Sequence, residues 1–218
     1  MNEVPAGFEG RRVPLIDDDG EARARILPEL RRGGVVLLPT DTIYGLSCRW
    51  DSERSRLRIQ AMKGPGRIGL FVALVSSVDM AFEYAEPPGP PGQQILQEQW
   101  PGPVTVVLRA RDDRVPPFCC GEDGTVAFRW PRSTFLQDLV RDLGVPLVST
   151  SANRTGEPNV PDAAEAWNVF GAAIDLYVDA GPRSGPPSTL IDLTGEKPQL
   201  LRLGVALPPG VEAPEDAR

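Results

Sequence analysis

The side chains best placed for chemistry follow the apolar run 35–38. They are two threonines, an aspartate and a tyrosine. Residues 39–46 read Pro-Thr-Asp-Thr-Ile-Tyr-Gly-Leu. The apolar run predicts a buried strand, and ligands of open α/β sheets bind just past the carboxyl ends of strands. Because Pro, Thr and Asp are also common turn formers, an ordinary turn is the alternative interpretation.

A second polar segment, residues 63–67, reads Lys-Gly-Pro-Gly-Arg. Two cations and the backbone amides of a flexible loop suit an anion such as a triphosphate. The segment is not a Walker A loop, because the order Gly-x-x-x-x-Gly-Lys-Ser/Thr is absent. Lys63 and Lys197 are the only lysines among 23 basic residues, and a compact ammonium binds phosphate as a point charge. A solvent-exposed basic loop is the alternative.

A third segment, residues 149–156, follows the apolar start of a strand at Leu147 and reads Ser-Thr-Ser-Ala-Asn-Arg-Thr-Gly. Its hydroxyls and amide form a dense set of hydrogen-bond donors and acceptors, or else cap a helix or turn. Thr105 and Arg129 are single polar side chains among apolar and ring residues, in the segments 100–105 and 126–131. For Arg129 a structural ion pair and an anion contact both remain open.

Composition narrows the chemistry further. The chain has 218 residues, a net charge of −7 and no histidine, which argues against non-specific coating of nucleic acid and excludes triads that use histidine. Catalysis would therefore depend on positioning, cations, hydroxyls or a bound metal. Cys48, Cys119 and Cys120 cannot build a disulfide framework, and without histidine a structural zinc site is not expected. With no membrane-spanning run and no signal peptide, we expect a cytoplasmic protein.

Strand-like and helix-like segments alternate, which predicts one α/β domain with a mixed sheet over residues 1–207. The predicted strands cover 11–16, 35–38, 70–75, 104–108, 125–128, 147–149, 176–178, 189–193 and 199–203. The predicted helices cover 21–32, with Pro28 as a candidate kink, 53–62 after an N-cap at Ser52, 78–84, 93–99, 133–143 and 163–170. We expect an exposed loop over 87–92 and a disordered tail over 208–218.

Taken in order, these segments resemble the YrdC/TsaC/YciO family of threonylcarbamoyl-AMP synthases. The matching stretches are residues 39–46, the loop at Lys63, 100–105, 126–131 and 149–156, together with 187–192 and 201–204. The resemblance extends over residues 20–205. It implies a YrdC-like α/β domain with a twisted mixed sheet, flanking helices and a concave ligand cleft.

The resemblance also implies a reaction. Family members convert L-threonine, bicarbonate and ATP into threonylcarbamoyl-adenylate and pyrophosphate, which feeds the threonylcarbamoyl modification of adenosine in tRNA. Mg²⁺ would accompany the phosphates of ATP, and no protein-bound metal is expected. Such a transfer needs no protein nucleophile, because the carbamate oxygen attacks the α-phosphate and the protein aligns reactants and neutralises charge. Contact with tRNA and with downstream tRNA-modification proteins is a further expectation.

The resemblance assigns site residues by motif. Lys63 and Arg67 are the expected catalytic cations. The expected ATP-binding residues are Lys63, Arg67, Thr105, Ser151, Asn153, Asn159 and Arg202. The expected threonine- and carbamate-binding residues are Thr40, Tyr44, Arg109, Arg129, Ser149 and Ser188. Arg109 and Asn159 are placed only by their spacing from Thr105 and Ser151.

The chain departs from the family pattern in one loop. The family loop reads Lys-x-Arg-Pro and then a polar residue before Pro-Leu, whereas this chain has Pro65, Gly66, Gly69 and Leu70 at those positions. Arg67 supplies a cation two positions after the expected one. The departure favours an alternative hypothesis, a YciO-like paralogue with weak or different activity. An RNA-binding module and an accessory domain of a carbamoyltransferase are further alternatives.

Overall fold

The computed structural model describes residues 7–15, 19–65, 71–111 and 114–211. Within these residues the strands are β1 (Arg12–Pro14), β2 (Val36–Pro39), β3 (Tyr44–Arg49), β4 (Val72–Leu74), β5 (Val104–Arg109), β6 (Thr125–Arg129), β7 (Leu147–Ser151), β8 (Leu176–Asp179), β9 (Thr189–Asp192) and β10 (Gln199–Arg202). The helices are α1 (Asp19–Arg31), α2 (Glu53–Lys63), α3 (Val78–Tyr84), α4 (Pro90–Gln99), α5 (Thr134–Leu143) and α6 (Ala163–Phe170), with short 3-10 turns at Pro117–Cys119 and Gly171–Ala173.

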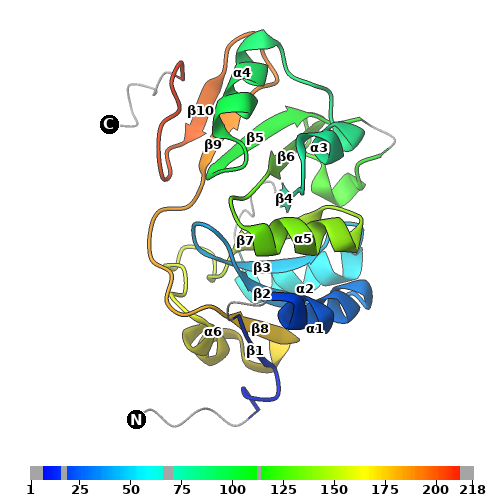
Figure 1. The fold of residues 1–218 in the computed structure, drawn as a ribbon, viewed down its shortest axis with the longest axis vertical. Coiled ribbons are helices and arrows are strands. Elements are labelled where there is room, and N and C mark those ends of the chain that lie inside the picture. The colour runs from blue at the N-terminus through cyan, green and yellow to red at the C-terminus, as the bar shows by residue number, and fades with distance from the viewer. Residues whose placement is uncertain (1–6, 16–18, 66–70, 112–113, 212–218) are drawn as a thin grey trace.

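The described strands join into one mixed sheet in the order β1-β8-β2-β3-β7-β4-β6-β5-β9-β10. The pairs β1–β8, β2–β8, β4–β6 and β5–β9 are parallel, and the remaining neighbours are antiparallel. Because β8 lies next to one edge and β9 next to the other, residues 180–188 must pass along the sheet from one end to the other. This crossing segment runs up one side of the molecule in Figure 1.

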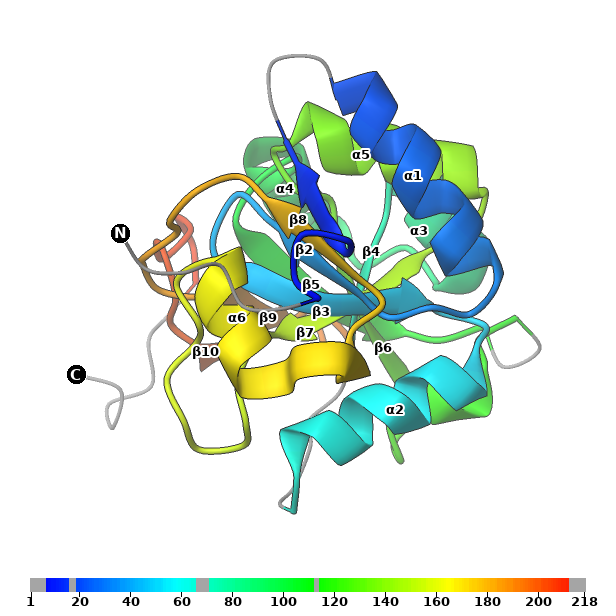
Figure 2. The same cartoon turned by 90° about the horizontal axis from the view of Figure 1, so that it is seen from below.

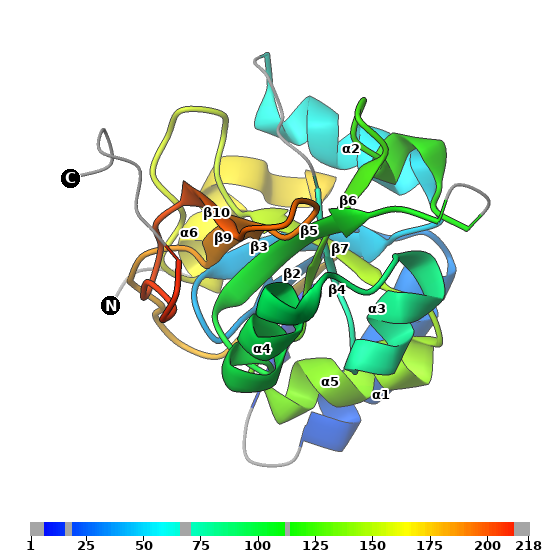
Figure 3. The ribbon, with the colours of Figure 1, turned by 90° about the horizontal axis from the view of Figure 1, so that it is seen from above.

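Helices cover both faces of the sheet. Figures 2 and 3 show α1 and α5 together on one side and α2 and α6 on the other. Alternate residues of β2 explain this arrangement, since Leu38 packs with Ile26 of α1 and Leu139 of α5, whereas Leu37 packs with Ile59 of α2 in the opposite core. An uninterrupted apolar strand is therefore buried on both faces, as its sequence predicts.

The sequence predicts most of these elements, and hydroxyl N-caps explain several of the helix boundaries. The side chains of Ser52, Ser77 and Ser133 accept hydrogen bonds from backbone N–H groups in the first turns of α2, α3 and α5. Helix α1 continues through Pro28 as far as Arg31. The family resemblance correctly implied a twisted mixed sheet with flanking helices.

Two local predictions are wrong. Strand β3 was not predicted, because Gly45 and Ser47 interrupt its apolar pattern; both are buried in a strand that lies between β2 and β7. Residues 90–92 were predicted as part of a loop but form the first turn of α4. Proline is well tolerated there, because the first N–H groups of a helix have no intrahelical partner.

At the carboxyl end, residues 208–211 form a turn, and the side chain of Val211 is buried against the core. The rest of the predicted tail, 212–218, lies outside the described residues. In the described part of the chain no helix is long and apolar enough to cross a bilayer.

The packing of α5 against α1 provides a test of the core. Leu139 is fully buried between α5, α1 and β2, so Leu139→Ala should lower the free energy of unfolding by about 2–5 kcal/mol, as measured by urea denaturation. Leu57→Ala is the matched control, because Leu57 is 49% exposed on α2 and should change stability by less than about 0.5 kcal/mol. Equal losses in the two variants would contradict this packing.

Candidate active site

A cavity of about 530 Å³ opens where the ends of several strands meet. Its walls come from the β2–β3 turn, the end of α2, strand β4, the ends of β6 and β7, the crossing segment and β10. The lining residues are Thr40, Thr42, Ile43, Tyr44, Gly45, Lys63, Val72, Leu74, Arg129, Ser149, Thr150, Ser151, Asn153, Thr155, Gly156, Asn159, Gly185, Pro187, Ser188 and Arg202. We call this cavity the cleft.

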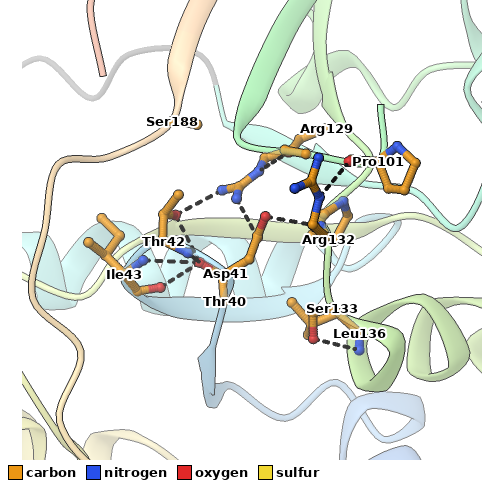
Figure 4. Close-up of polar contacts among 12 residues, drawn as sticks. Thr40, Asp41, Thr42, Ile43, Pro101, Arg129, Arg132, Ser133, Leu136 and Ser188 are labelled. Atoms are coloured by element: carbon orange, nitrogen blue, oxygen red, sulfur yellow. Dashed lines mark hydrogen bonds and ion pairs between the residues drawn. The ribbon is translucent and has the colours of Figure 1, made fainter. Parts of the chain in front are cut away.

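The β2–β3 turn is organised by the hydroxyl of Thr40. Its Oγ1 donates to the carbonyl of Ile43 (2.7 Å) and accepts from the N–H groups of Thr42 (3.1 Å) and Ile43 (3.2 Å). A threonine that bonds its own turn in this way fixes the local backbone. The Thr40 hydroxyl thus shapes the turn that directs Asp41 and Thr42 toward Arg129 (Figure 4).

Arg129, at the end of β6, is held from three directions. Its Nε donates to the Gly102 carbonyl (3.2 Å), one terminal nitrogen donates to Thr42 Oγ1 (3.0 Å), and the other forms an ion pair with Asp41. The second carboxylate oxygen of Asp41 accepts from the Arg132 N–H (3.0 Å), as Figure 4 shows. Burial lowers the pKa of Arg129, and the neighbouring Asp41 opposes that shift. The guanidinium is therefore oriented and largely neutralised within the wall of the cleft.

Lys63, the last residue of α2, is buried among neutral oxygens. Its Nζ donates to the carbonyls of Ser151 (3.0 Å) and Asn153 (3.2 Å) and to Asn153 Oδ1 (3.3 Å). The Lys63 carbonyl in turn accepts from the Thr155 N–H (2.9 Å). No carboxylate pairs with this ammonium among the described residues, and burial lowers its pKa.

The loop after β7 is held by Lys63 and by its own side chains. Ser151 Oγ donates to Asn153 Oδ1 (2.5 Å), and Asn153 Nδ2 donates to the carbonyls of Arg154 (2.8 Å) and Glu157 (2.7 Å). These hydrogen bonds fold the loop around the ammonium.

Glycine makes room for the hydroxyl of Ser149 beside this loop. Gly45 of β3 lies next to β7, and a Cβ at position 45 would overlap Ser149 Oγ. That oxygen accepts a hydrogen bond from Ser47 Oγ (3.2 Å). Gly45 and Ser47, which interrupt the apolar pattern of β3, are therefore the residues that surround the Ser149 hydroxyl beside the cleft.

On the opposite side, Ser188 joins the crossing segment to β5 and β10. Its hydroxyl shares a 2.7 Å hydrogen bond with Thr105 Oγ1, and its carbonyl accepts from the Arg202 guanidinium (3.0 Å). Gly204 allows the next part of the chain to lie against residues 187–189, because a Cβ there would overlap their backbone. Burial lowers the pKa of Arg202, and the nearby charge of Arg129 lowers it further.

The structure brings most of the predicted site residues to the cleft, namely Thr40, Tyr44, Lys63, Arg129, Ser149, Ser151, Asn153, Asn159, Ser188 and Arg202. Thr105 is fully buried behind Ser188 and does not line the cleft. Arg109 is exposed at the other end of β5, about 13 Å along the strand from Thr105 at about 3.3 Å per residue. Arg67 lies outside the described residues.

Sequence reasoning missed several contributors. Asp41 and Thr42 belong to the segment 39–46, but nothing in the sequence shows that Arg129 is their partner. Thr155 lay in the third segment without an assigned role. Gly185 and Pro187 reach the cleft because the crossing segment passes beside it; Pro187 begins the matching stretch 187–192 but had no assigned role, and Gly185 lies outside every matching stretch.

The electrostatics of the cleft define a class of ligand. Arg129 is balanced by Asp41, whereas Lys63 and Arg202 form no ion pair with a carboxylate of the described residues. In a chain of net charge −7, two such cations concentrate positive potential in one place. The described residues also contain no cluster of three or more Cys, Asp or Glu suited to a metal. Fold and cleft together define an α/β protein whose cleft suits anionic ligands.

Comparison with known proteins identifies the family. The Sua5/YciO/YrdC family model, described as telomere recombination, matches residues 29–204, and the chain belongs to this family. Threonylcarbamoyl-AMP synthase of Nitrosococcus oceani is 34% identical over 77% of this chain and 91% of that protein. The synthase of Halorhodospira halophila is 35% identical over 82% of this chain and 87% of that protein.

Solved structures share the fold. Sua5 of P. abyssi, in a complex with L-threonine, has a TM-score of 0.80 and 29% identity, and the match covers 88% of this chain. The chain spans just over half of that Sua5 chain, 56%. YciO of E. coli, at 24% identity, has the same fold with a TM-score of 0.81 over 89% of this chain and 94% of that chain.

The contact between Gly45 and Ser149 can be tested by a double-mutant cycle. Gly45→Ala should destabilise the protein by about 1–3 kcal/mol, because the new methyl group overlaps Ser149 Oγ. Adding Ser149→Ala removes that oxygen, so the double variant should lose at least about 0.5 kcal/mol less than the sum of the single variants in urea denaturation. Strict additivity would show that the two positions do not meet.

Proposed function

We propose that this protein is a threonylcarbamoyl-AMP synthase, which uses L-threonine, bicarbonate and ATP and supplies the threonylcarbamoyl modification of tRNA. The observation that carries the proposal is the pair of cations in the cleft, Lys63 and Arg202, which no carboxylate of the described residues neutralises. All three substrates carry anionic groups. The family relationship and the relatives named as synthases support the same conclusion.

The reaction proceeds through two bond-forming steps. The threonine amine and bicarbonate give a carbamate and release water. A carbamate oxygen then attacks the α-phosphorus of ATP, the bond to the β-phosphate breaks, and pyrophosphate leaves. The protein's part is to align these groups and to stabilise the negative charge that moves onto the leaving phosphates.

The two sides of the cleft suit different parts of the reactants. Lys63 with Ser151 and Asn153 would bind the phosphates. The Lys63 ammonium already has three oxygen partners, so a phosphate oxygen would replace one of them and gain a charge-assisted hydrogen bond. Because the loop is already ordered, this exchange requires little rearrangement.

The opposite side suits threonine and its carbamate. Arg129 and Ser188 line this side, and Arg129 retains N–H groups beyond those given to Asp41, Thr42 and Gly102. The fixed orientation of its guanidinium suits bidentate recognition of a carboxylate. Ser149, whose position depends on Gly45, contributes a hydroxyl between the two sides.

Magnesium would enter as a partner of the ATP phosphates. The donor set of the cleft supports this route, because it consists of hydroxyls, amides and cations, and the carboxylate of Asp41 is committed to Arg129 and Arg132. When bound, the ion would neutralise phosphate charge. The acyl-adenylate product would then pass to tRNA-modification proteins that transfer the threonylcarbamoyl group to adenosine.

The direct test is pyrophosphate release. Purified protein with ATP and Mg²⁺ should release pyrophosphate only when both L-threonine and bicarbonate are present, because the carbamate is the attacking group. Omission of either one should reduce the rate to background, and serine or valine in place of threonine should give lower rates. A chain that binds ATP but releases no pyrophosphate with any amino acid would refute the proposal.

The role of Lys63 gives a separate prediction. Lys63→Ala should weaken ATP binding about tenfold or more by calorimetry, because a hydrogen bond to a charged group is lost. Lys197→Ala is the matched control, since Lys197 is the other lysine and is exposed.

The pH dependence of binding follows from the buried state of Lys63. Its pKa is lowered from the ordinary 10.5, so in wild type ATP affinity should fall as rising pH deprotonates Lys63, starting below that value. Lys63→Ala should lack this alkaline decline. Unchanged affinity in Lys63→Ala, or the same decline in that variant, would contradict the assignment.

A further inference from the structure

The hydroxyl of Tyr44 is committed to backbone and not to the cleft. The side chain is fully buried, and its Oη donates to the Gly181 carbonyl (2.8 Å) and accepts from the Ala180 N–H (3.0 Å). Both partners belong to the start of the crossing segment. Burying a phenol without partners is costly, so these two hydrogen bonds account for a tyrosine at a position where phenylalanine would pack equally well.

The crossing segment connects this contact to the cleft. Its later residues, Gly185, Pro187 and Ser188, line the cleft. Its far end is fixed by the hydrogen bond between Ser188 and Thr105 and by the Thr189 N–H, which donates to the Pro103 carbonyl (3.0 Å). The start of the segment has its own attachments: the two hydrogen bonds of the Tyr44 hydroxyl, the Gly181 N–H donating to Asp179 Oδ1 (3.0 Å) and the Arg183 N–H donating to the Pro161 carbonyl (2.7 Å). Of these, only Tyr44 also borders the cleft from β3.

Tyr44 also reaches the phosphate side through its backbone. Its carbonyl accepts a hydrogen bond from the Ala152 N–H (3.0 Å), in the middle of the loop that surrounds Lys63. One residue thus joins the loop on one side of the cleft to the crossing segment on the other. Substitution of the Tyr44 side chain would remove its contacts with the crossing segment and leave the backbone hydrogen bond with Ala152 in place.

We propose that Tyr44 is a positioning residue whose hydroxyl acts on the substrates through the crossing segment rather than by direct contact. It fixes the start of that segment and thereby sets where Pro187 and Ser188 meet the threonine side of the cleft. This inference rests on the proposed function, and it replaces the direct threonine or carbamate contact that the family resemblance implies for Tyr44.

The test compares Tyr44→Phe with Tyr177→Phe. Tyr177 is a matched control, because it is also fully buried and its hydroxyl also donates to a glycine carbonyl, that of Gly171 (2.5 Å), away from the crossing segment. Amide hydrogen exchange measured by NMR should show the Ala180 amide exchanging at least about tenfold faster in Tyr44→Phe and unchanged in Tyr177→Phe.

Kinetics supply the second readout. In pyrophosphate release, Tyr44→Phe should raise the KM for threonine about three- to tenfold while the KM for ATP changes less than about twofold, because the contact with Ala152 remains. Tyr177→Phe should leave both constants unchanged. A general loss of stability would not separate the two substrates in this way.

Two outcomes would overturn the inference: an unchanged Ala180 amide in Tyr44→Phe, or equal effects on the KM values for threonine and ATP. Absence of pyrophosphate release from wild type would instead refute the proposed function. The exchange of Ala180 would then still decide whether Tyr44 holds the crossing segment.

Discussion

The burial of the Lys63 ammonium is the constraint on which the site depends. A buried cation is costly unless its donors are satisfied, and here three neutral oxygens of the loop after β7 satisfy them. The same contacts tie the end of α2 to β7, so helix and strand are placed relative to each other by a polar group. Because no carboxylate of the described residues cancels the charge, the arrangement leaves positive potential available for an anion.

The cations of the cleft differ in whether a carboxylate balances their charge. Arg129 is paired with Asp41 and is held by carbonyl and hydroxyl oxygens, so it contributes shape and orientation more than net charge. Lys63 and Arg202 contribute net charge. Net charge and fixed geometry thus come from different side chains of one cavity, which suits a reaction that must hold a polyphosphate and an amino acid together.

Local patterns in the sequence predicted the elements well, because strand and helix signals depend on neighbouring residues. The hydroxyl caps at Ser52 and Ser133 are of this kind. Strand β3 was missed because the reason for Gly45 is Ser149, which lies far away in the sequence. Similarly, counting along β5 from Thr105 suggested Arg109, but a strand carries its residues steadily away from the cleft.

The places of Gly185 and Pro187 in the cleft do not follow from local sequence, because they depend on the route of the crossing segment across the sheet, whereas Ser188 was assigned through the family resemblance. For Arg129 the sequence left an ion pair and an anion contact open. The structure shows the ion pair with Asp41 and also places the guanidinium in the wall of the cleft. What local secondary-structure propensity did not give was the order of the strands in the sheet, which brings these residues together.

The pairing of β1 with β8 has a consequence for how the chain folds during its synthesis on the ribosome. Residues 12–14 pair with 177–179, so β1, the first of the described strands, leaves the ribosome long before its partner β8. Until then β1 lacks its partner strand, and contacts so distant in sequence form slowly. This edge of the described sheet is therefore completed only after β8 has been synthesised.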